Sequence, residues 1–290
     1  MITHALLQSE GLGPARLSWL NEIGIHSWRD VIERADEVGF RWMDALVSEC
    51  HRCEQALQEA NIAYFVDRFT GPDRWRILAH YIDQTSFFDI ETTGLEYDAP
   101  ISVIVCWHQG RLHSFVEHEN LDDFLDLLDE ITLLASFNGS SFDVPRLLDS
   151  FHIPQLPCPH LDLRWLSYHQ GHRGGLKQIA YALGIQRPHD LTDADGELAI
   201  YLWTRWMAKQ DRSCRDRLVR YCGSDVLLTL MLAHSLAGRP QPQAELWDQL
   251  GGEPAPSLLP LLPLPIPPGN FGTGSPSKLR SRRVSQANGW

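Results

Sequence analysis

Between residues 87 and 236 the chain alternates short apolar runs of β-strand type with segments of helical periodicity, and this alternation is the strongest constraint on its fold. Runs of strand type are expected at residues 87–91, 101–108, 111–118, 132–137 and 161–163. Helical segments are expected at residues 121–129, 142–151, 176–183, 196–209 and 212–237. This order of elements predicts an α/β domain with one central sheet at residues 83–238.

The first 82 residues have a different, mainly helical pattern. Gly11-Leu12-Gly13-Pro14, followed by apolar residues at helical spacing and by Gly24-Ile25, predicts two short helices joined by a glycine hairpin at residues 1–37. A helical connector is expected at residues 38–82. Glycines allow close approach of a partner and expose amide groups at a helix start, where phosphate can bind. Residues 1–37 resemble a helix-hairpin-helix motif, which binds nucleic-acid backbone, although a simple pair of packed helices explains the pattern equally well.

Residues 239–290 are rich in proline, which excludes regular helices and central strands, and predict a disordered tail. The end of this tail is basic and carries Lys278, Arg280, Arg282 and Arg283. These residues fit either a solvated basic end or a loose arm that contacts phosphate.

The overall composition describes an acidic, ordinary globular protein. The 25 basic and 37 acidic residues give a net charge of −12, which argues against coating nucleic acid by bulk attraction. The apolar run at residues 258–268 is too short and too rich in proline to span a membrane, and no secretory leader precedes the first helix. The scattered cysteines fit a reducing compartment, so we expect a cytoplasmic protein with no membrane contact. Cys50 and Cys53 have no second pair at zinc-ribbon spacing and are expected to be ordinary helix cysteines.

The most informative motif is Asp89-Ile90-Glu91-Thr92-Thr93-Gly94, at the end of an apolar run. Side chains two residues apart on a strand share a face, so Asp89 and Glu91 project from one side of the sheet. Acids this close repel each other unless cations or protons intervene. The pair therefore indicates a metal site, with a solvated strand end as the alternative.

Two further motifs contain acids at positions suited to the same site. Asp143 follows the break of a buried strand at Asn138-Gly139 and falls in the first turn of a helix, a position that acids also favour electrostatically. Tyr221 and Asp225 are four residues apart in a helical stretch and therefore share one helix face.

Together the three motifs resemble the DEDD, or DnaQ-like, superfamily of 3′-5′ exonucleases, which has a ribonuclease H-like fold. The resemblance covers about residues 83–237. It assigns Asp89 and Glu91 to the first motif, Asp143 to the second and Asp225 to the third, with Tyr221 in the tyrosine position of the DEDDy subtype. The glycine-containing start, residues 75–77 and residues 160–163 are similar to bacterial YprB-like ribonuclease H-like proteins. Cys222 departs from that pattern, because asparagine more often follows the tyrosine.

The resemblance implies a mixed sheet flanked by helices and phosphodiester hydrolysis with two divalent cations, Mg²⁺ or Mn²⁺. Asp89, Glu91, Asp143 and Asp225 would hold the metals, and Tyr221 would orient or deprotonate the attacking water. Asp162 is expected to hydrogen-bond a neighbouring element rather than to bind metal.

The expected partner is nucleic acid, offered as a single-stranded end or a 3′ terminus, and no protein partner is inferred. Basic side chains at residues 205–220, or Arg164, Arg173 and Lys177, would contact phosphate. Residues expected to bind nucleic acid are Gly11, Gly13, Thr92, Asn138, Arg217 and Arg220. The sequence leaves DNA or RNA open, and two alternatives stand beside an exonuclease: a catalytically silent binding module and a structure-selective endonuclease.

Overall fold

The computed structural model describes residues 1–96, 98–191, 196–240 and 243–250. The prediction of a disordered tail therefore falls mostly on residues outside the described ones. The beginning of the tail differs from the prediction, because residues 243–250 form α12 (Gln243–Trp247) and the 3-10 turn η5 (Asp248–Leu250). Leu246, Trp247 and Leu250 pack against the main core, which explains why this proline-flanked segment is helical.

The centre of the fold is one mixed five-stranded sheet with the order β3-β2-β1-β4-β5. Strands β1, β2 and β3 pair antiparallel, whereas β4 lies parallel to β1 and β5 parallel to β4. The strands are β1 (Thr85–Thr92), β2 (Ile101–His108), β3 (Arg111–Val116), β4 (Leu133–Ser136) and β5 (His160–Asp162). The predicted α/β class, a mixed sheet flanked by helices, is confirmed.

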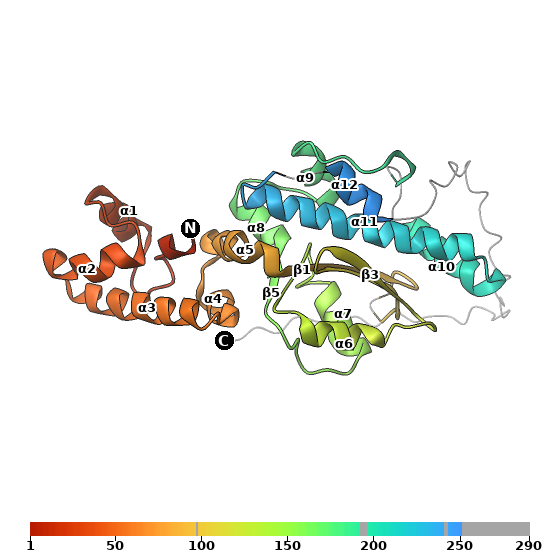
Figure 1. Cartoon of the computed structure of the whole chain (residues 1–290), viewed down its shortest axis with the longest axis horizontal. Helices are drawn as coiled ribbons and strands as arrows, with labels where there is room; N and C mark the ends of the chain where they lie inside the picture. The colour runs from red at the N-terminus through yellow and green to blue at the C-terminus, as the bar shows by residue number, and fades with distance from the viewer. Residues whose placement is uncertain (97, 192–195, 241–242, 251–290) are drawn as a thin grey trace, which may run out of the picture. The chain divides into compact units, whose positions relative to one another are not determined.

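Helices cover both faces of this sheet, as Figure 1 shows for α11 on one face and for α6 and α7 on the other. The helices after β1 are α6 (Asp123–Glu130), α7 (Asp143–Ser150), α8 (Leu163–His169), α9 (Leu176–Ala182), α10 (Gly196–Lys209) and α11 (Arg212–Leu236), with the 3-10 turn η4 (His189–Leu191). Neighbouring residues of β1 point to opposite cores: Phe87 packs in the core that contains Val226 of α11, and Phe88 packs in the core that contains Phe124 of α6. This alternation decides which side of the sheet carries Asp89 and Glu91.

The sequence missed α8, because residues 161–163 were predicted as a strand with no helix after it. The strand ends at Asp162, whose side chain accepts a hydrogen bond from the amide of Arg164 (3.0 Å) and caps the new helix. An acid at this position is a helix-start signal as well as a possible metal ligand.

Helices also make up the part of the chain before β1. They are α1 (Pro14–Glu22), α2 (Trp28–Val38), α3 (Arg41–Gln58), α4 (Ile62–Arg68) and α5 (Trp75–Tyr81), with 3-10 turns η1 (Ile2–His4), η2 (Gly71–Asp73) and η3 (Ile82–Gln84). Trp28 of α2 stacks on Phe65 of α4, with ring centroids 6.1 Å apart. The expected segments 1–37 and 38–82 thus share one hydrophobic core.

The glycines in the first 37 residues lie at two different places relative to the short helices. Gly11 adopts a positive φ of 78° and Gly13 caps α1, but only the 3-10 turn η1, and no helix, precedes them. The two short helices α1 and α2 are instead joined through Gly24, which also has a positive φ (77°). Gly11 and Gly13 therefore do not connect two helices, because residues 5–13 consist of turns and irregular backbone.

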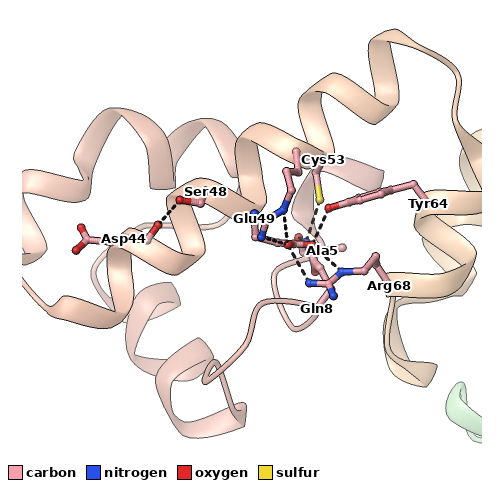
Figure 2. A network of polar contacts seen from close by, with 9 residues as sticks. Ala5, Gln8, Asp44, Ser48, Glu49, Cys53, Tyr64 and Arg68 are labelled. Carbon is pink, nitrogen blue, oxygen red and sulfur yellow. Dashed lines mark hydrogen bonds and ion pairs between the residues drawn. The ribbon is translucent and has the colours of Figure 1, made fainter.

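A buried acid holds the N-terminal helices together (Figure 2). Glu49 of α3 is 1% exposed and accepts hydrogen bonds from Tyr64 (2.9 Å), Arg52 (2.6 Å) and Arg68 (2.9 Å). A buried charge is tolerated only when it is paired and fully hydrogen-bonded. This network therefore ties α3 to α4.

The structure also describes Cys50 and Cys53 and the helices that could be tested for crossing a membrane. Cys50 and Cys53 are fully buried free thiols, and burial raises the pKa of Cys53 to about 11. Neither belongs to a group of three or more metal-binding side chains among the described residues. Across all the residues that the structure describes, no helix combines the length and the apolar character needed to cross a membrane.

Candidate active site

The site begins on β1, where Asp89 and Glu91 alternate with the buried Ile90. Ile90 packs in the core beneath α6, so the two acids lie on the opposite face of the sheet, under α11. Both carboxylates are half-buried. The predicted shared face of Asp89 and Glu91 follows from the regular pairing of β1 with β2, which continues through Glu91 opposite Val103.

A tight turn after β4 supplies the third acid. Asn138 has a positive φ of 68°, and an added Cβ at Gly139 would lie 1.8 Å from the Ser136 hydroxyl, so the turn needs glycine at 139. Asp162 accepts hydrogen bonds from the amides of Asn138 (2.8 Å) and Ser140 (3.1 Å), and from the Ser140 hydroxyl. The expectation that Asp162 bonds a neighbouring element is confirmed.

Asp143 begins α7 directly after this turn and is 3% exposed. Its Oδ1 atom is buried without a hydrogen-bond partner in the part of the chain that the structure describes. Burial raises the pKa of Asp143 to about 7. A buried acceptor oxygen left unpaired is costly and calls for a ligand that can contact it.

Helix α11 supplies Tyr221, Cys222 and Asp225 to the same region. Cys222 Sγ donates to Asp89 at 3.3 Å from the backbone oxygen and 3.6 Å from Oδ2. Gly223 of α11 leaves room for Leu250 of η5, because an added Cβ at Gly223 would lie 3.2 Å from the Leu250 side chain. The predicted face shared by Tyr221 and Asp225 is thus held against β1.

The four acids act on one another electrostatically. Burial raises the pKa of Asp89 well above its ordinary value, and the charges of Asp143, Asp225 and Glu91 raise it further. Burial and the charge of Asp225 do the same to Glu91. The site therefore favours protons or cations among these acids.

Two basic residues already balance part of this charge. Arg187 is 6% exposed, and its guanidinium lies 2.6 Å from Asp225 Oδ1. Lys177 Nζ donates to the Tyr221 hydroxyl at 3.2 Å. Burial still raises the pKa of Asp225, although Arg187 and Lys177 oppose the rise. Arg187 was missed by the sequence analysis because it lies in an irregular loop, and no periodic signal marks it.

The donor set fits divalent cations that prefer oxygen. One group of metal-capable atoms, from Asp89, Glu91 and Cys222, lies within 4.8 Å of one another among the described residues. Asp143, with its unpaired buried oxygen, and Asp225, paired with Arg187, are not part of this group. Carboxylate oxygens of this kind suit Mg²⁺ or Mn²⁺.

A pocket of 270 Å³ opens onto the acids, lined by Asp89, Asp225, Phe137 and Lys177 among others. Thr92, one of the residues expected to bind nucleic acid, is buried and donates to the backbone oxygen of Gly94 at 2.8 Å. Asn138 lies at the turn beside the pocket and accepts from Arg164 at 2.6 Å. Gly11 and Gly13 lie in the N-terminal helical part, which carries none of the four acids.

Three of the six basic residues at 205–220 form ion pairs within the protein. Arg220 lies 3.0 Å from Asp190, Arg215 2.6 Å from Glu119, and Arg205 3.7 Å from Asp211. Arg217 is half-buried on α11. The partners Asp190 and Glu119 are distant from this run in sequence, so the sequence alone did not reveal the ion pairs. Fewer basic side chains of the run are therefore available to phosphate than the sequence indicated. Nucleic-acid contact by Arg217 and Arg220 stays a prediction.

Comparison with known proteins places this site in a family. No curated protein matches the chain. Among solved structures, the family B DNA polymerase from the hyperthermophilic archaeon Pyrobaculum calidifontis is similar, with 19% identity and a TM-score of 0.43 over 52% of this chain and 24% of the polymerase. A family model for the RNase_H superfamily matches residues 86–237, from β1 through α11 and more than half of the chain. The chain therefore belongs to the RNase_H superfamily.

Proposed function

We propose that this protein is a metal-dependent nuclease, a 3′-5′ exonuclease of the tyrosine subtype that hydrolyses phosphodiester bonds of DNA or RNA. The observation that carries the proposal is the convergence of Asp89, Glu91, Asp143 and Asp225 from a strand, a helix start and a late helix. A cluster of acids that raise one another's pKa is costly to keep unless the function needs it. Membership of the RNase_H superfamily supports the same reading.

The four acids would have different roles in binding the ions. Two divalent cations bound here would cancel charge on the scissile phosphate, activate a water and stabilise the leaving oxygen. Asp89, whose charge interacts with all three other acids, would serve as a ligand of both ions. Glu91 and Asp225 would complete one ion site, and Asp143 would act mainly through water on the other.

Tyr221 is assigned to the attacking water. Burial raises the pKa of its phenol above the ordinary value, and the charge of Asp225 raises it further. The phenol therefore keeps its proton at neutral pH, so it positions a water by hydrogen bonding rather than by removing a proton. Of the two roles that the sequence allowed for Tyr221, orientation is the one that these surroundings favour.

Asp225 can contact a cation through Oδ2, because the ion pair with Arg187 engages Oδ1. The 2.6 Å ion pair between them shows that the carboxylate is already matched to positive charge at that position. Arg187 can then remain beside the site and offer its guanidinium to a substrate phosphate.

The test is cleavage of a single-stranded oligonucleotide labelled at its 5′ or its 3′ end, with Mg²⁺, Mn²⁺ or EDTA. A 3′-5′ exonuclease shortens the 5′-labelled strand stepwise and releases labelled mononucleotide from the 3′-labelled strand. Asp89→Asn, which keeps the side-chain shape, is the matched inactive control. Internal cuts at the earliest times would instead indicate an endonuclease. Absence of cleavage with both metals, on single-stranded and duplex DNA and RNA, would reject the proposal.

A further inference from the structure

A second, larger pocket adjoins the acids and has a different lining. Its volume is 610 Å³, and it shares Phe137 and Gly175 with the pocket that contains Asp89 and Asp225. Ligand sites in proteins commonly measure roughly 300–1,000 Å³. The pocket is thus large enough for a nucleotide unit and shares part of its lining with the proposed reaction site.

Two aromatic side chains of α8 face this pocket while remaining open to solvent. Trp165 is 49% exposed and Tyr168 44% exposed. They are three residues apart on the helix and therefore neighbours on its surface, with ring centroids 6.1 Å apart. Large aromatic rings usually bury most of their surface, so a pair left open inside a pocket favours a ligand with a flat apolar face.

The same pocket carries positive charge. The Arg173 guanidinium lies 4.2 Å from the centre of the Tyr168 ring, and the Arg164 guanidinium donates to Asn138 at 2.6 Å. Both arginines are exposed at the pocket. In a protein with a net charge of −12, these cations offer a local attraction for phosphate beside the acids.

We propose that this pocket is a binding subsite for unpaired nucleotides of the substrate strand, next to the scissile phosphate. Trp165 and Tyr168 stack on bases, and Arg164 and Arg173 contact the backbone. This inference rests on the proposed nuclease function and narrows its substrate to single-stranded nucleic acid. Bases in a duplex already stack and pair with one another, so they cannot lie on Trp165 without first being unpaired.

The first test is the affinity of a fluorescein-labelled single-stranded oligonucleotide, measured by anisotropy in EDTA so that the strand stays intact. Stacking on an aromatic side chain is worth about 1–3 kcal/mol per base, so Trp165→Ala should weaken binding by about 5- to 150-fold. Trp165→Phe, which keeps an aromatic face, should restore most of the affinity. Met207→Ala, at an exposed apolar side chain of α10 outside the pocket, should bind as the wild type does.

The second test separates the phosphate contact from the stacking. Arg173→Gln should lower the slope of log affinity against log salt by about 1, because one cation fewer contacts the phosphates. It also provides a variant that leaves α8 unchanged if Trp165→Ala fails to fold. The Trp165→Ala substitution should weaken the binding of a blunt duplex of the same sequence less than it weakens the binding of the single strand.

The outcomes distinguish failure of the proposed subsite from failure of the proposed nuclease function. If wild-type protein cleaves but Trp165→Ala and Arg173→Gln bind single strands unchanged, the subsite is wrong and the nuclease stands. If wild-type protein binds through Trp165 and Arg173 but cleaves nothing, the subsite stands and the nuclease is wrong. If wild-type protein neither binds nor cleaves, both are rejected.

Discussion

At the scale of single residues, three of the four acids of the site have different neighbours that hold them. Cys222 bonds Asp89, the turn after β4 places Asp143, and Arg187 pairs with Asp225. The carboxylates can stay together because these neighbours offset part of the repulsion among them. Removing such a neighbour should therefore lower the stability of the metal-free protein more than that of the metal-loaded protein.

Arg187→Met gives the clearest case. The pair between Arg187 and Asp225 is nearly buried, at 6% and 11% exposed, and removal of one partner of a buried pair costs about 3–5 kcal/mol. We expect urea unfolding in EDTA to show a loss of this size, and added Mg²⁺ to restore more stability in the variant than in the wild type. Arg215→Met, which breaks a more exposed pair with Glu119, should cost about 1 kcal/mol or less. Equal losses in the two variants would contradict the role given to Arg187.

Tyr221→Phe tests the assignment of the phenol. The ring keeps its packing on α11, while the hydroxyl that contacts Lys177 at 3.2 Å is removed. Loss of a group that positions or transfers a proton typically costs about 100- to 10,000-fold in rate, and we expect about 100-fold in kcat because bound metal already activates water. Oligonucleotide affinity should not change. A wild-type kcat in the variant would remove Tyr221 from the mechanism.

At the scale of secondary structure, the site depends on how the ends of neighbouring strands are anchored. Asp162, at the end of β5, bonds the amides of Asn138 and Ser140 in the turn after β4 and also caps α8. That single side chain connects the turn before Asp143 to the helix that carries Trp165.

Asp162→Ala should therefore destabilise the protein and slow cleavage together. The loss combines a helix cap, worth about 1 kcal/mol, with two hydrogen bonds to amides of the turn, worth about 0.5–1.5 kcal/mol each, so a loss of about 2 kcal/mol is expected in urea unfolding. Asp149→Ala, at an exposed acid of α7, should change stability by less than about 0.5 kcal/mol. Normal stability in Asp162→Ala would mean that the turn is held by other contacts.

The sequence predicted strands and long helices well, because their periodicity is local. Residues 101–108 were predicted as a strand with the observed bounds of β2, and residues 212–237 as a helix one residue longer than α11. Helix α8 was missed because a seven-residue helix offers little periodicity. The internal pairing of Arg215 and Arg220 could not be predicted either, since their partners Glu119 and Asp190 meet them only after folding.

At the scale of the whole molecule, the N-terminal helices depend on a charge that responds to pH. Burial alone would raise the pKa of Glu49, but hydrogen bonds from Arg68, Arg52 and Tyr64 outweigh it and hold the pKa below its ordinary value of 4.5. A carboxyl with a depressed pKa in the folded state stabilises the protein above the unfolded pKa, and that stability is lost as the pH falls through the folded pKa.

Glu49→Gln should therefore be less stable than the wild type at pH 7, and the difference should shrink as the pH falls below about 4.5. Unfolding by urea at a series of pH values, followed by tryptophan fluorescence, measures this difference. A gap between wild type and variant that stays constant from pH 7 to pH 3 would show that the carboxylate charge does not stabilise the N-terminal helices.

The central claim is that acids from β1, α7 and α11 form one centre for two divalent cations. Counting the Mn²⁺ ions bound per chain, from the electron paramagnetic resonance signal of free Mn²⁺ in the presence of a nucleoside monophosphate, tests it most directly. We expect two bound ions in the wild type and at most one in Asp89→Asn, because Asp89 would serve as a ligand of both ions. Two ions bound with unchanged affinity in Asp89→Asn, or none bound in the wild type, would contradict it.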